Sequence, residues 1–212
     1  MKRMIAWESQ LEQKACYLFE FSPAVVEFVE QPETLVFQHQ DGMCRYTPDF
    51  KLSLYNGEIV YVEVKPLSKL CSSKTLERLQ LAYQFLAEKG YRFIVLTDQE
   101  LNFPNRIRNL SILRPYLRFE VPGHISEQAK VWVSHISNPT FENLSRFLGL
   151  QSTALALLAQ LQIVFDLDKP LNHTSQLFTP PNGDIHRETC LFTYRSGLNF
   201  EQRTVPIDPH AG

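Results

Sequence analysis

The sequence has no long hydrophobic run, which excludes a membrane-spanning protein of the usual helical kind. None of its apolar stretches approaches the ~20 residues that a helix needs to cross a bilayer. The N-terminus also lacks the hydrophobic segment of a secretory signal peptide. We therefore expect a soluble protein of the cytoplasm that has no membrane partner.

Its cysteines lack the spacing of a zinc site or a disulfide framework. There are four of them in 212 residues, with no C-x-x-C pair and no histidine pair nearby: Cys16, Cys44, Cys71 and Cys190. Reduced thiols in a cytosol are the simplest interpretation of this pattern.

An excess of positive charge is absent as well. The formal net charge is −2, whereas a protein that coats nucleic acid is basic. The charge does not exclude a nuclease, because a nuclease site keeps acids for a metal and needs only local basic groups. The 44% hydrophobic and 21% charged residues are typical of a globular protein.

Hydrophobic periodicity predicts a mixed α/β domain over residues 1–103. A helix is expected after Ser9 and before Pro23, and a second over residues 72–90, with Gly90 placed to end it. The segments with strand patterns are residues 24–31, 34–40, 43–55, 58–65 and 91–97.

The remainder of the chain predicts a second, smaller domain and a tail. After a linker with a helical piece, residues 140–178 give helix, glycine-containing turn, helix and two short strands, the pattern of a winged helix. We therefore expect a winged-helix-like domain over residues 104–178. Its second helix, STALALLAQLQ, carries no positive charge, which favours a protein-docking surface or weak backbone binding over base recognition.

Residues 179–212 contain few apolar side chains and predict an extended tail. The apolar groups that are present cluster between residues 191 and 200, and we expect Phe192, Tyr194 and Phe200 to bind a partner protein. The alternative is that this segment folds back as a last strand on the winged-helix-like domain.

The stretch YTPDFKLSLYNGEIVYVEVKP, residues 46–66, predicts a β-hairpin whose register decides where its charges lie. A two-residue turn at Asn56 and Gly57 pairs Phe50 with Glu63 and sets apolar against polar residues along the ladder. A three-residue loop that includes Tyr55, with Gly57 in the left-handed region, pairs matching residues instead.

In this second register one face of the hairpin is apolar: Phe50, Leu52, Val60, Val62 and Val64. The opposite face carries Asp49, Glu63 and Lys65, with the two acids facing each other ~5 Å apart at Cβ. Such carboxylates repel unless one is protonated or a cation lies between them, and hard oxygen ligands suit Mg²⁺ or Mn²⁺. The motif fits metal-assisted hydrolysis of a phosphodiester, and a solvated hairpin face with a cross-strand ion pair fits it equally well.

Glu12 also has two interpretations. SQLE fits a capping box in which Glu12 reaches back to the amide of Ser9 at the start of the first helix. The residue can also supply a carboxylate to the site.

The order of the motifs SQLE, VVEFVEQP, TPDF, VEVKP, TLERLQLAYQFL and FIVLTDQELN resembles the TnsA family over roughly residues 9–103. TnsA proteins are the endonuclease subunits of heteromeric Tn-seven-type transposases, including CRISPR-associated ones. The resemblance implies a restriction-endonuclease-like fold and an active site on Glu12, Asp49, Glu63 and Lys65. It also implies Mg²⁺, for which Mn²⁺ can substitute, held by the three acids and the backbone carbonyl of Val64.

The resemblance further implies a function and its partners. The expected reaction is cleavage of the non-transferred strand at the 5′ ends of a mobile element during cut-and-paste transposition. DNA, a DDE-type transposase subunit (TnsB-like) and an AAA+ regulator (TnsC-like) are the implied partners, in a bacterial cytoplasm and at the nucleoid when in complex. Lys69, Lys74 and Arg78 become candidates for DNA phosphate contact. The alternative function is a catalytically silent adaptor between the regulator and the transposase.

Overall fold

The structure is a computed structural model that describes residues 10–39, 42–180 and 191. These residues fall into two compact units. The N-terminal unit runs to Asn102 and takes in Leu191, and the C-terminal unit begins at Phe103. Each unit is described by itself.

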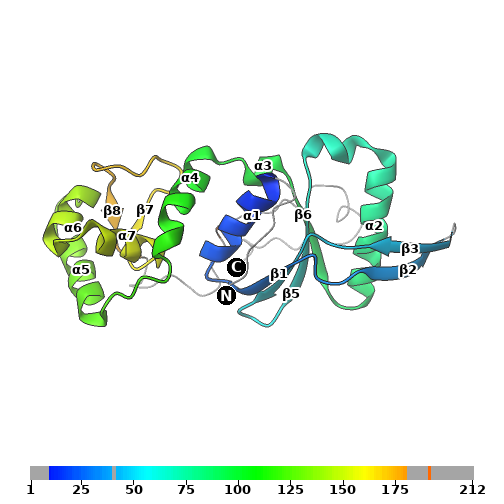
Figure 1. The fold of residues 1–212 in the computed structure, drawn as a ribbon, viewed down its shortest axis with the longest axis horizontal. Coiled ribbons are helices and arrows are strands. Elements are labelled where there is room, and N and C mark those ends of the chain that lie inside the picture. The colour runs from blue at the N-terminus through cyan, green and yellow to red at the C-terminus, as the bar shows by residue number, and fades with distance from the viewer. Residues whose placement is uncertain (1–9, 40–41, 181–190, 192–212) are drawn as a thin grey trace. The chain divides into compact units, whose positions relative to one another are not determined.

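The N-terminal unit is built on a four-stranded sheet of order β1-β4-β5-β6 (Figure 1). Its strands are β1 (Val25–Glu30), β4 (Phe50–Leu54), β5 (Ile59–Val64) and β6 (Arg92–Leu96). The first three are antiparallel, and β6 runs parallel to β5. A parallel neighbour requires a long crossover, which η1 (Leu67–Cys71) and α2 (Ser73–Glu88) supply.

The β4–β5 hairpin has the register that its hydrophobic pattern predicts. Phe50 pairs with Val62 and Leu52 with Val60, so the prediction of a three-residue loop is confirmed. Gly57 closes the loop with φ +85°, a conformation that glycine adopts without strain. Asp49 precedes the first paired residue of β4, and the same register places it opposite Glu63.

One face of the sheet packs against α1 (Gln10–Phe21), as the apolar face of the hairpin predicts. Ala15, Leu18 and Phe19 of this helix are buried. The Phe19 ring lies 5.3 Å from that of Phe50, centroid to centroid, in an edge-to-face arrangement that aromatic pairs favour.

The other face is not solvated, so of the two interpretations of the hairpin the solvated face is wrong. It is covered by α2 and by a separate two-stranded ribbon, β2 (Leu35–His39) and β3 (Gly42–Tyr46). Figure 1 shows α1 and α2 on opposite sides of the sheet. Tyr61 and Glu63 are therefore 2% and 4% exposed.

The physical reason is a break in the segment that was expected to form one long strand over residues 43–55. Thr47, Pro48 and Asp49 separate β3 from β4, and a proline has no N–H to donate to a ladder. The chain turns there, so β2 and β3 fold over the sheet as a ribbon and bury Leu35, Phe37 and Tyr46.

A short helix after β6 fixes the neighbouring strand end. α3 (Asp98–Leu101) begins with a capping box made by Thr97 and Glu100. The Asp98 carboxylate accepts a hydrogen bond of 2.7 Å from the amide of Leu67. Together with the 2.9 Å bond from the Lys65 amide to the Leu96 carbonyl, this contact holds the chain on both sides of Pro66.

The C-terminal unit contains four α-helices and a short hairpin within the part of it that is described. These elements are α4 (Pro104–Leu113), η2 (Arg114–Tyr116), α5 (Gly123–His135), α6 (Phe141–Leu148), α7 (Gln151–Ala159), β7 (Val164–Phe165) and β8 (Leu177–Phe178). The expected order of helix, glycine turn, helix and two strands is present, and an isolated bridge between Thr140 and Gln176 adds a second pairing to that of β7 with β8. Assignment as a winged helix stays a prediction.

Two helices of this unit have residues buried in its core, one of them in the segment that was expected to be a linker. α4 is an integral helix, since Leu110 and Leu113 are 0% and 1% exposed. α7 is central, with every residue from Ala154 to Ala159 buried. No helix in the described ranges combines the length and apolar character needed to cross a membrane.

Asn109 joins α4 to the chain after β7. Its buried side chain donates to the carbonyls of Leu167 and Lys169 at 2.9 and 2.8 Å, and accepts from the amide of Leu171 at 3.0 Å. We predict that Asn109→Ala lowers the free energy of unfolding of the C-terminal unit by about 2–4 kcal/mol, because three partly buried hydrogen bonds to the backbone are lost together with a fully buried side chain.

The control is Asn105→Ala, which removes one exposed bond to the Asp168 carbonyl and should cost less than about 1 kcal/mol. Urea unfolding of the full chain measures both changes. Equal destabilisation by the two variants contradicts the role of Asn109.

Candidate functional site

Acidic and basic side chains meet at one end of the sheet in the N-terminal unit. Asp49 lies just before β4, Glu63 near the end of β5, and Lys65 one residue beyond that strand. Glu12 lies in the first turn of α1. Strand pairing accounts for the first three positions, because the register fixed by the apolar face places them together.

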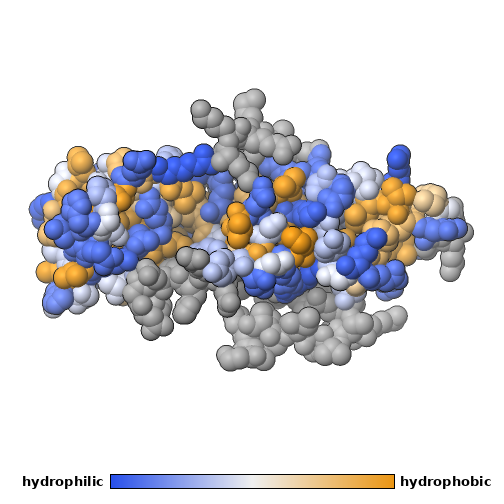
Figure 2. All heavy atoms as spheres, turned by 90° about the horizontal axis from the view of Figure 1, so that it is seen from below, coloured by the Kyte–Doolittle hydropathy of each residue, from blue (hydrophilic) through white to orange (hydrophobic). Residues whose placement is uncertain are grey.

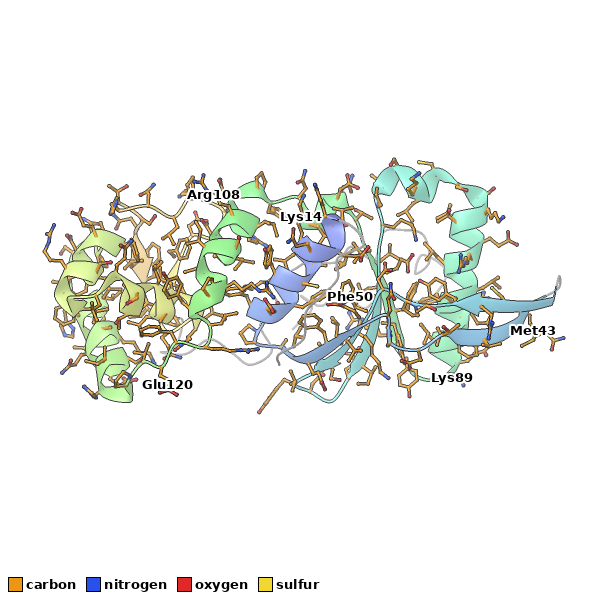
Figure 3. The ribbon with its side chains drawn as sticks, viewed as in Figure 1. Lys14, Met43, Phe50, Lys89, Arg108 and Glu120 are labelled. Carbon is orange, nitrogen blue, oxygen red and sulfur yellow. The ribbon has the colours of Figure 1, made fainter. Side chains whose placement is uncertain are left out.

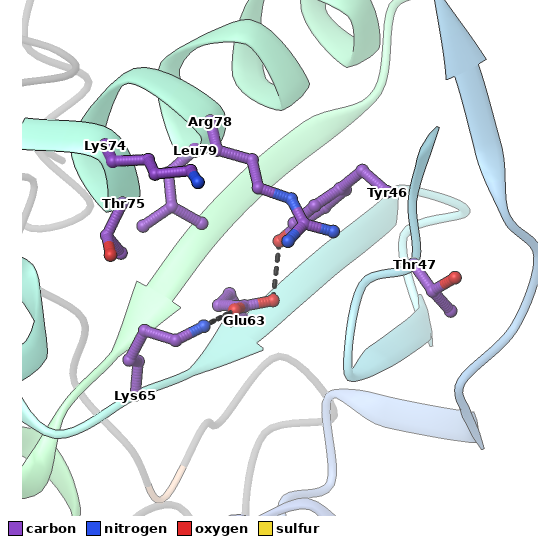
Figure 4. A pocket seen from close by; sticks show the side chains of 8 residues that line it. All are labelled: Tyr46, Thr47, Glu63, Lys65, Lys74, Thr75, Arg78 and Leu79. Carbon is purple, nitrogen blue, oxygen red and sulfur yellow. Dashed lines mark hydrogen bonds and ion pairs between the residues drawn. The ribbon is translucent and has the colours of Figure 1, made fainter. Parts of the chain in front are cut away.

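Glu63 is the buried centre of this group. Tyr46 donates a hydrogen bond of 2.5 Å from its hydroxyl to Oε2, and Lys65 pairs with Oε1 (Figure 4). Burial and the Glu63 carboxylate raise the pKa of the Tyr46 hydroxyl, which therefore remains a proton donor. Both oxygens of a carboxylate that is 4% exposed thus have a partner, as buried charges require.

Asp49 is anchored to the same strand by its side chain. Its Oδ2 accepts a hydrogen bond of 2.7 Å from the amide of Val64. Burial first, and then the charges of Glu63 and Glu12, raise the pKa of Asp49 from 3.8 to about 7 against the opposing effects of Val64 and Lys65. Asp49 therefore lies close enough to Glu63 and to Glu12 to be repelled by each of them.

Neighbouring carboxylates can bind a divalent cation, since Mg²⁺ and Mn²⁺ prefer hard oxygen donors. A cation also removes the repulsion that raises the pKa of Asp49. The expected convergence of Glu12, Asp49 and Glu63 is, however, not present as a preformed set. Within the described ranges, no three Asp, Glu, His or Cys side chains gather closely enough to hold a metal, and the Glu63 oxygens are engaged by Tyr46 and Lys65.

The Val64 backbone contacts Asp49 through its amide. The role of its carbonyl as a metal ligand stays a prediction. For Glu12, the expected cap partner Ser9 lies outside the described residues, although the helix does begin at Gln10.

A cavity of about 300 Å³ opens beside Glu63. The side chains that line it are Tyr46, Thr47, Glu63, Lys65, Lys74, Thr75, Arg78 and Leu79 (Figure 4). Two of the three candidates for phosphate contact, Lys74 and Arg78, thus share a cavity with Lys65. Lys69 is exposed on η1 and does not line it.

Tyr46, Thr47 and Thr75 are site residues that the sequence analysis missed. Arg78 stacks over the Tyr46 ring, 5.5 Å from its centroid, and donates to the carbonyl of Arg45 at 3.1 Å. For Tyr46 the sequence did hold an indication, because a buried tyrosine hydroxyl needs a polar partner. The ribbon that brings Tyr46 over Glu63 could not be inferred from an uninterrupted strand.

The expected partner-binding residues Phe192, Tyr194 and Phe200 lie outside the described residues. Leu191, which is described, donates a hydrogen bond of 2.9 Å from its amide to the Ser22 hydroxyl. That hydroxyl in turn donates to the Leu18 carbonyl at 2.6 Å. Residue 191 therefore contacts the N-terminal unit, and neither interpretation of the tail is tested by it.

Comparison with known proteins gives one family. Residues 22–98 match the family model described as "TnsA-like endonuclease N terminal". The matched range includes Asp49, Glu63 and Lys65 and begins after Glu12. No curated protein matches the chain significantly.

We predict that Asp49→Asn stabilises the metal-free protein, and does so more at pH 8 than at pH 5. The raised pKa means that the folded state favours the protonated acid; the resulting stability is present below pH 4 and is lost as the pH rises through about 7. At pH 8 the amide removes the repulsion while still accepting from Val64, and we expect a gain of about 1–2 kcal/mol in the free energy of unfolding.

Thermal unfolding in EDTA at pH 5, 6.5 and 8 measures the effect. Glu88→Gln, an exposed acid at the end of α2, is the matched control and should show no such pH dependence. A loss of stability in Asp49→Asn at pH 8 contradicts the crowding of the carboxylates.

Proposed function

Residues 22–98 of this chain match the model of a TnsA-like endonuclease N-terminal domain, and on that premise we propose that the protein is a Mg²⁺-dependent DNA endonuclease of a transposase complex. It hydrolyses the non-transferred strand at the 5′ ends of a mobile element. The observation that carries this proposal is the meeting of Asp49, Glu63 and Lys65 at one end of the sheet inside the matched domain.

Asp49 and Glu63, with Glu12 and the Val64 carbonyl, are the groups proposed to hold the metal. A bound Mg²⁺ supplies Lewis acidity toward a phosphoryl oxygen and lowers the pKa of a coordinated water. For Glu63 this role requires a change of partner, since Tyr46 and Lys65 engage its oxygens in the structure described.

Lys65 is the proposed stabiliser of charge on the phosphate. Its side chain is 31% exposed and lines the cavity, so its ammonium group can reach a phosphodiester there while remaining beside the acids. A fixed positive charge next to an oxygen that gains negative charge lowers the barrier to hydrolysis.

Lys74 and Arg78 are proposed to bind the DNA backbone near the cleaved bond. They stand four residues apart on α2, which places them on the same face of that helix, and both line the cavity with Lys65. Lys69, which is exposed before α2, is proposed to contact a phosphate farther away.

The C-terminal unit is proposed to dock on protein partners, a DDE-type transposase and an AAA+ regulator. The buried position of α7 supports the absence of base recognition in this proposal, because a helix whose residues 154–159 are all buried cannot present them to base edges. Assembly on DNA places the protein at the nucleoid of a bacterial cytoplasm. The winged-helix assignment and the binding role of Phe192, Tyr194 and Phe200 belong to this proposal.

One observation favours the alternative of a catalytically silent adaptor. Both Glu63 oxygens are engaged, and no three-acid group is gathered in the described part of the chain. Against it, each of the four expected positions carries a side chain competent for metal binding or charge stabilisation.

We predict that Asp49→Ala and Lys65→Ala each abolish nicking at the element ends, measured with the assembled partner proteins, Mg²⁺ and end-labelled DNA. Loss of a metal ligand or of the ammonium group costs about 3–4 kcal/mol in the transition state, a reduction of at least about 10²-fold.

Lys51→Ala is the matched control, because Lys51 lies on β4 and pairs with Glu33 instead of the site acids. It should nick within about twofold of wild type. Near-normal nicking by Asp49→Ala or Lys65→Ala favours the adaptor.

A further inference from the structure

The β2–β3 ribbon has two faces of different character. One face packs on the N-terminal unit: Leu35, Phe37 and Tyr46 are buried, and the Phe37 ring lies 5.2 Å from that of Phe85 on α2. The other face is exposed, and we call it the ribbon face. Its members are Thr34, Val36, Gln38, Met43, Arg45 and Thr47.

Strand pairing places these six side chains in two matched rows. Val36 pairs with Arg45 and Gln38 with Met43. Thr34 and Thr47 extend the same register, with their hydroxyl oxygens 2.8 Å apart. Because side chains at every second position share a face, the rows form one continuous surface.

The composition of the ribbon face suits DNA. It contains one positive charge and no carboxylate, so nothing on it repels phosphate. Arginine and glutamine are among the residues that make paired hydrogen bonds to base edges, and apolar side chains contact the thymine methyl group. Its apolar members are open to a ligand, with Val36 42% and Met43 68% exposed.

The ribbon face is continuous with the candidate site. Thr47 lines the cavity beside Glu63, and Arg78 joins the two features by lining the same cavity while donating to the Arg45 carbonyl. In Figure 3, Met43 lies at the far end of the ribbon, where the ribbon projects past α2. In Figure 2, hydrophobic and hydrophilic surface adjoin at that end of the N-terminal unit.

We propose that the ribbon face lies in the major groove of the duplex that flanks the cleaved phosphodiester. A groove about 12 Å wide accepts a two-stranded ribbon. A five-residue strand such as β3 spans about 17 Å, which corresponds to about five base pairs at 3.4 Å each. The inference rests on the proposed function and adds to it a recognition element, with Arg45 and Gln38 as the side chains that reach the bases.

The test is DNA binding by the full chain in EDTA, so that no cleavage intervenes. A fluorescent 30-base-pair duplex is titrated at several salt concentrations with wild type, Arg45→Ala, Arg45→Glu and Gln38→Ala. The matched controls are Lys89→Ala and Gln84→Ala, which remove an exposed cation and an exposed amide from α2 or its C-terminal end.

We expect Arg45→Ala to weaken binding about fivefold or more and to reduce the salt slope by about 1, and Arg45→Glu to weaken it further. Gln38→Ala should weaken binding about threefold with an unchanged slope. The controls should stay within twofold, and thermal unfolding should be unaltered, because the Arg45 carbonyl that Arg78 uses is retained in both variants.

Equal affinity and salt slope for wild type and the Arg45 variants overturn the proposal. So does the absence of duplex binding by wild type, or a loss of partner-protein binding in these variants without a loss of DNA binding. The nicking assay separates the two claims. If wild type nicks DNA but Arg45→Glu binds DNA as tightly as wild type, the ribbon proposal is wrong and the endonuclease proposal stands. If Arg45→Glu binds DNA more weakly but wild type does not nick, the endonuclease proposal is wrong and the ribbon proposal stands.

Discussion

The arrangement of the N-terminal unit depends on a carboxylate that is buried between a hydroxyl and an ammonium group. Glu63 is 4% exposed, and a buried charge without partners is expensive enough to oppose folding. Tyr46 brings one partner from the ribbon, and Lys65 brings the other from the end of β5. The ribbon must therefore close over the sheet for this acid to be tolerated there. The same closure buries Leu35 and Phe37 against α2.

That dependence explains which parts of the fold could be predicted from the sequence. The β4–β5 register could, because alternate apolar residues have one arrangement that buries them together. The helices α1 and α2 could be placed for the same reason. The burial of the second face of the sheet could not be predicted, because alternating hydrophobicity places a charged residue such as Glu63 on a solvent-exposed face. The sequence feature that accounts for the ribbon is the break at Pro48, which lets the ribbon fold over the sheet. The residues on both sides of Pro48 favour a strand, and the segment was therefore expected to be one long strand.

For the site too, the residues placed by strand pairing could be predicted and those placed by packing of the ribbon could not. Local pattern placed Asp49, Glu63 and Lys65 together because one strand pair positions all three. The family resemblance added Lys69, Lys74 and Arg78 as candidates, of which Lys74 and Arg78 line the cavity. Tyr46 and Thr47 were missed because their proximity to Glu63 depends on long-range packing of the ribbon. In the C-terminal unit, the absence of positive charge from α7 argued against base recognition by that helix, and the burial of its residues 154–159 is consistent with this prediction.

The charges of the cavity are compatible with the proposed phosphate contact even though the chain has a net charge of −2. Lys65, Lys74 and Arg78 line it, and Glu63 is the single acid among its lining residues. One of these cations is paired with that acid, so the cavity carries an excess of positive charge before any metal is considered. Because salt screens charges beyond about 8–10 Å, a phosphate in the cavity responds to this local excess and hardly to the acids spread over the remaining surface. The surface acids that give the chain its negative net charge therefore have little effect on the binding of a phosphate in the cavity.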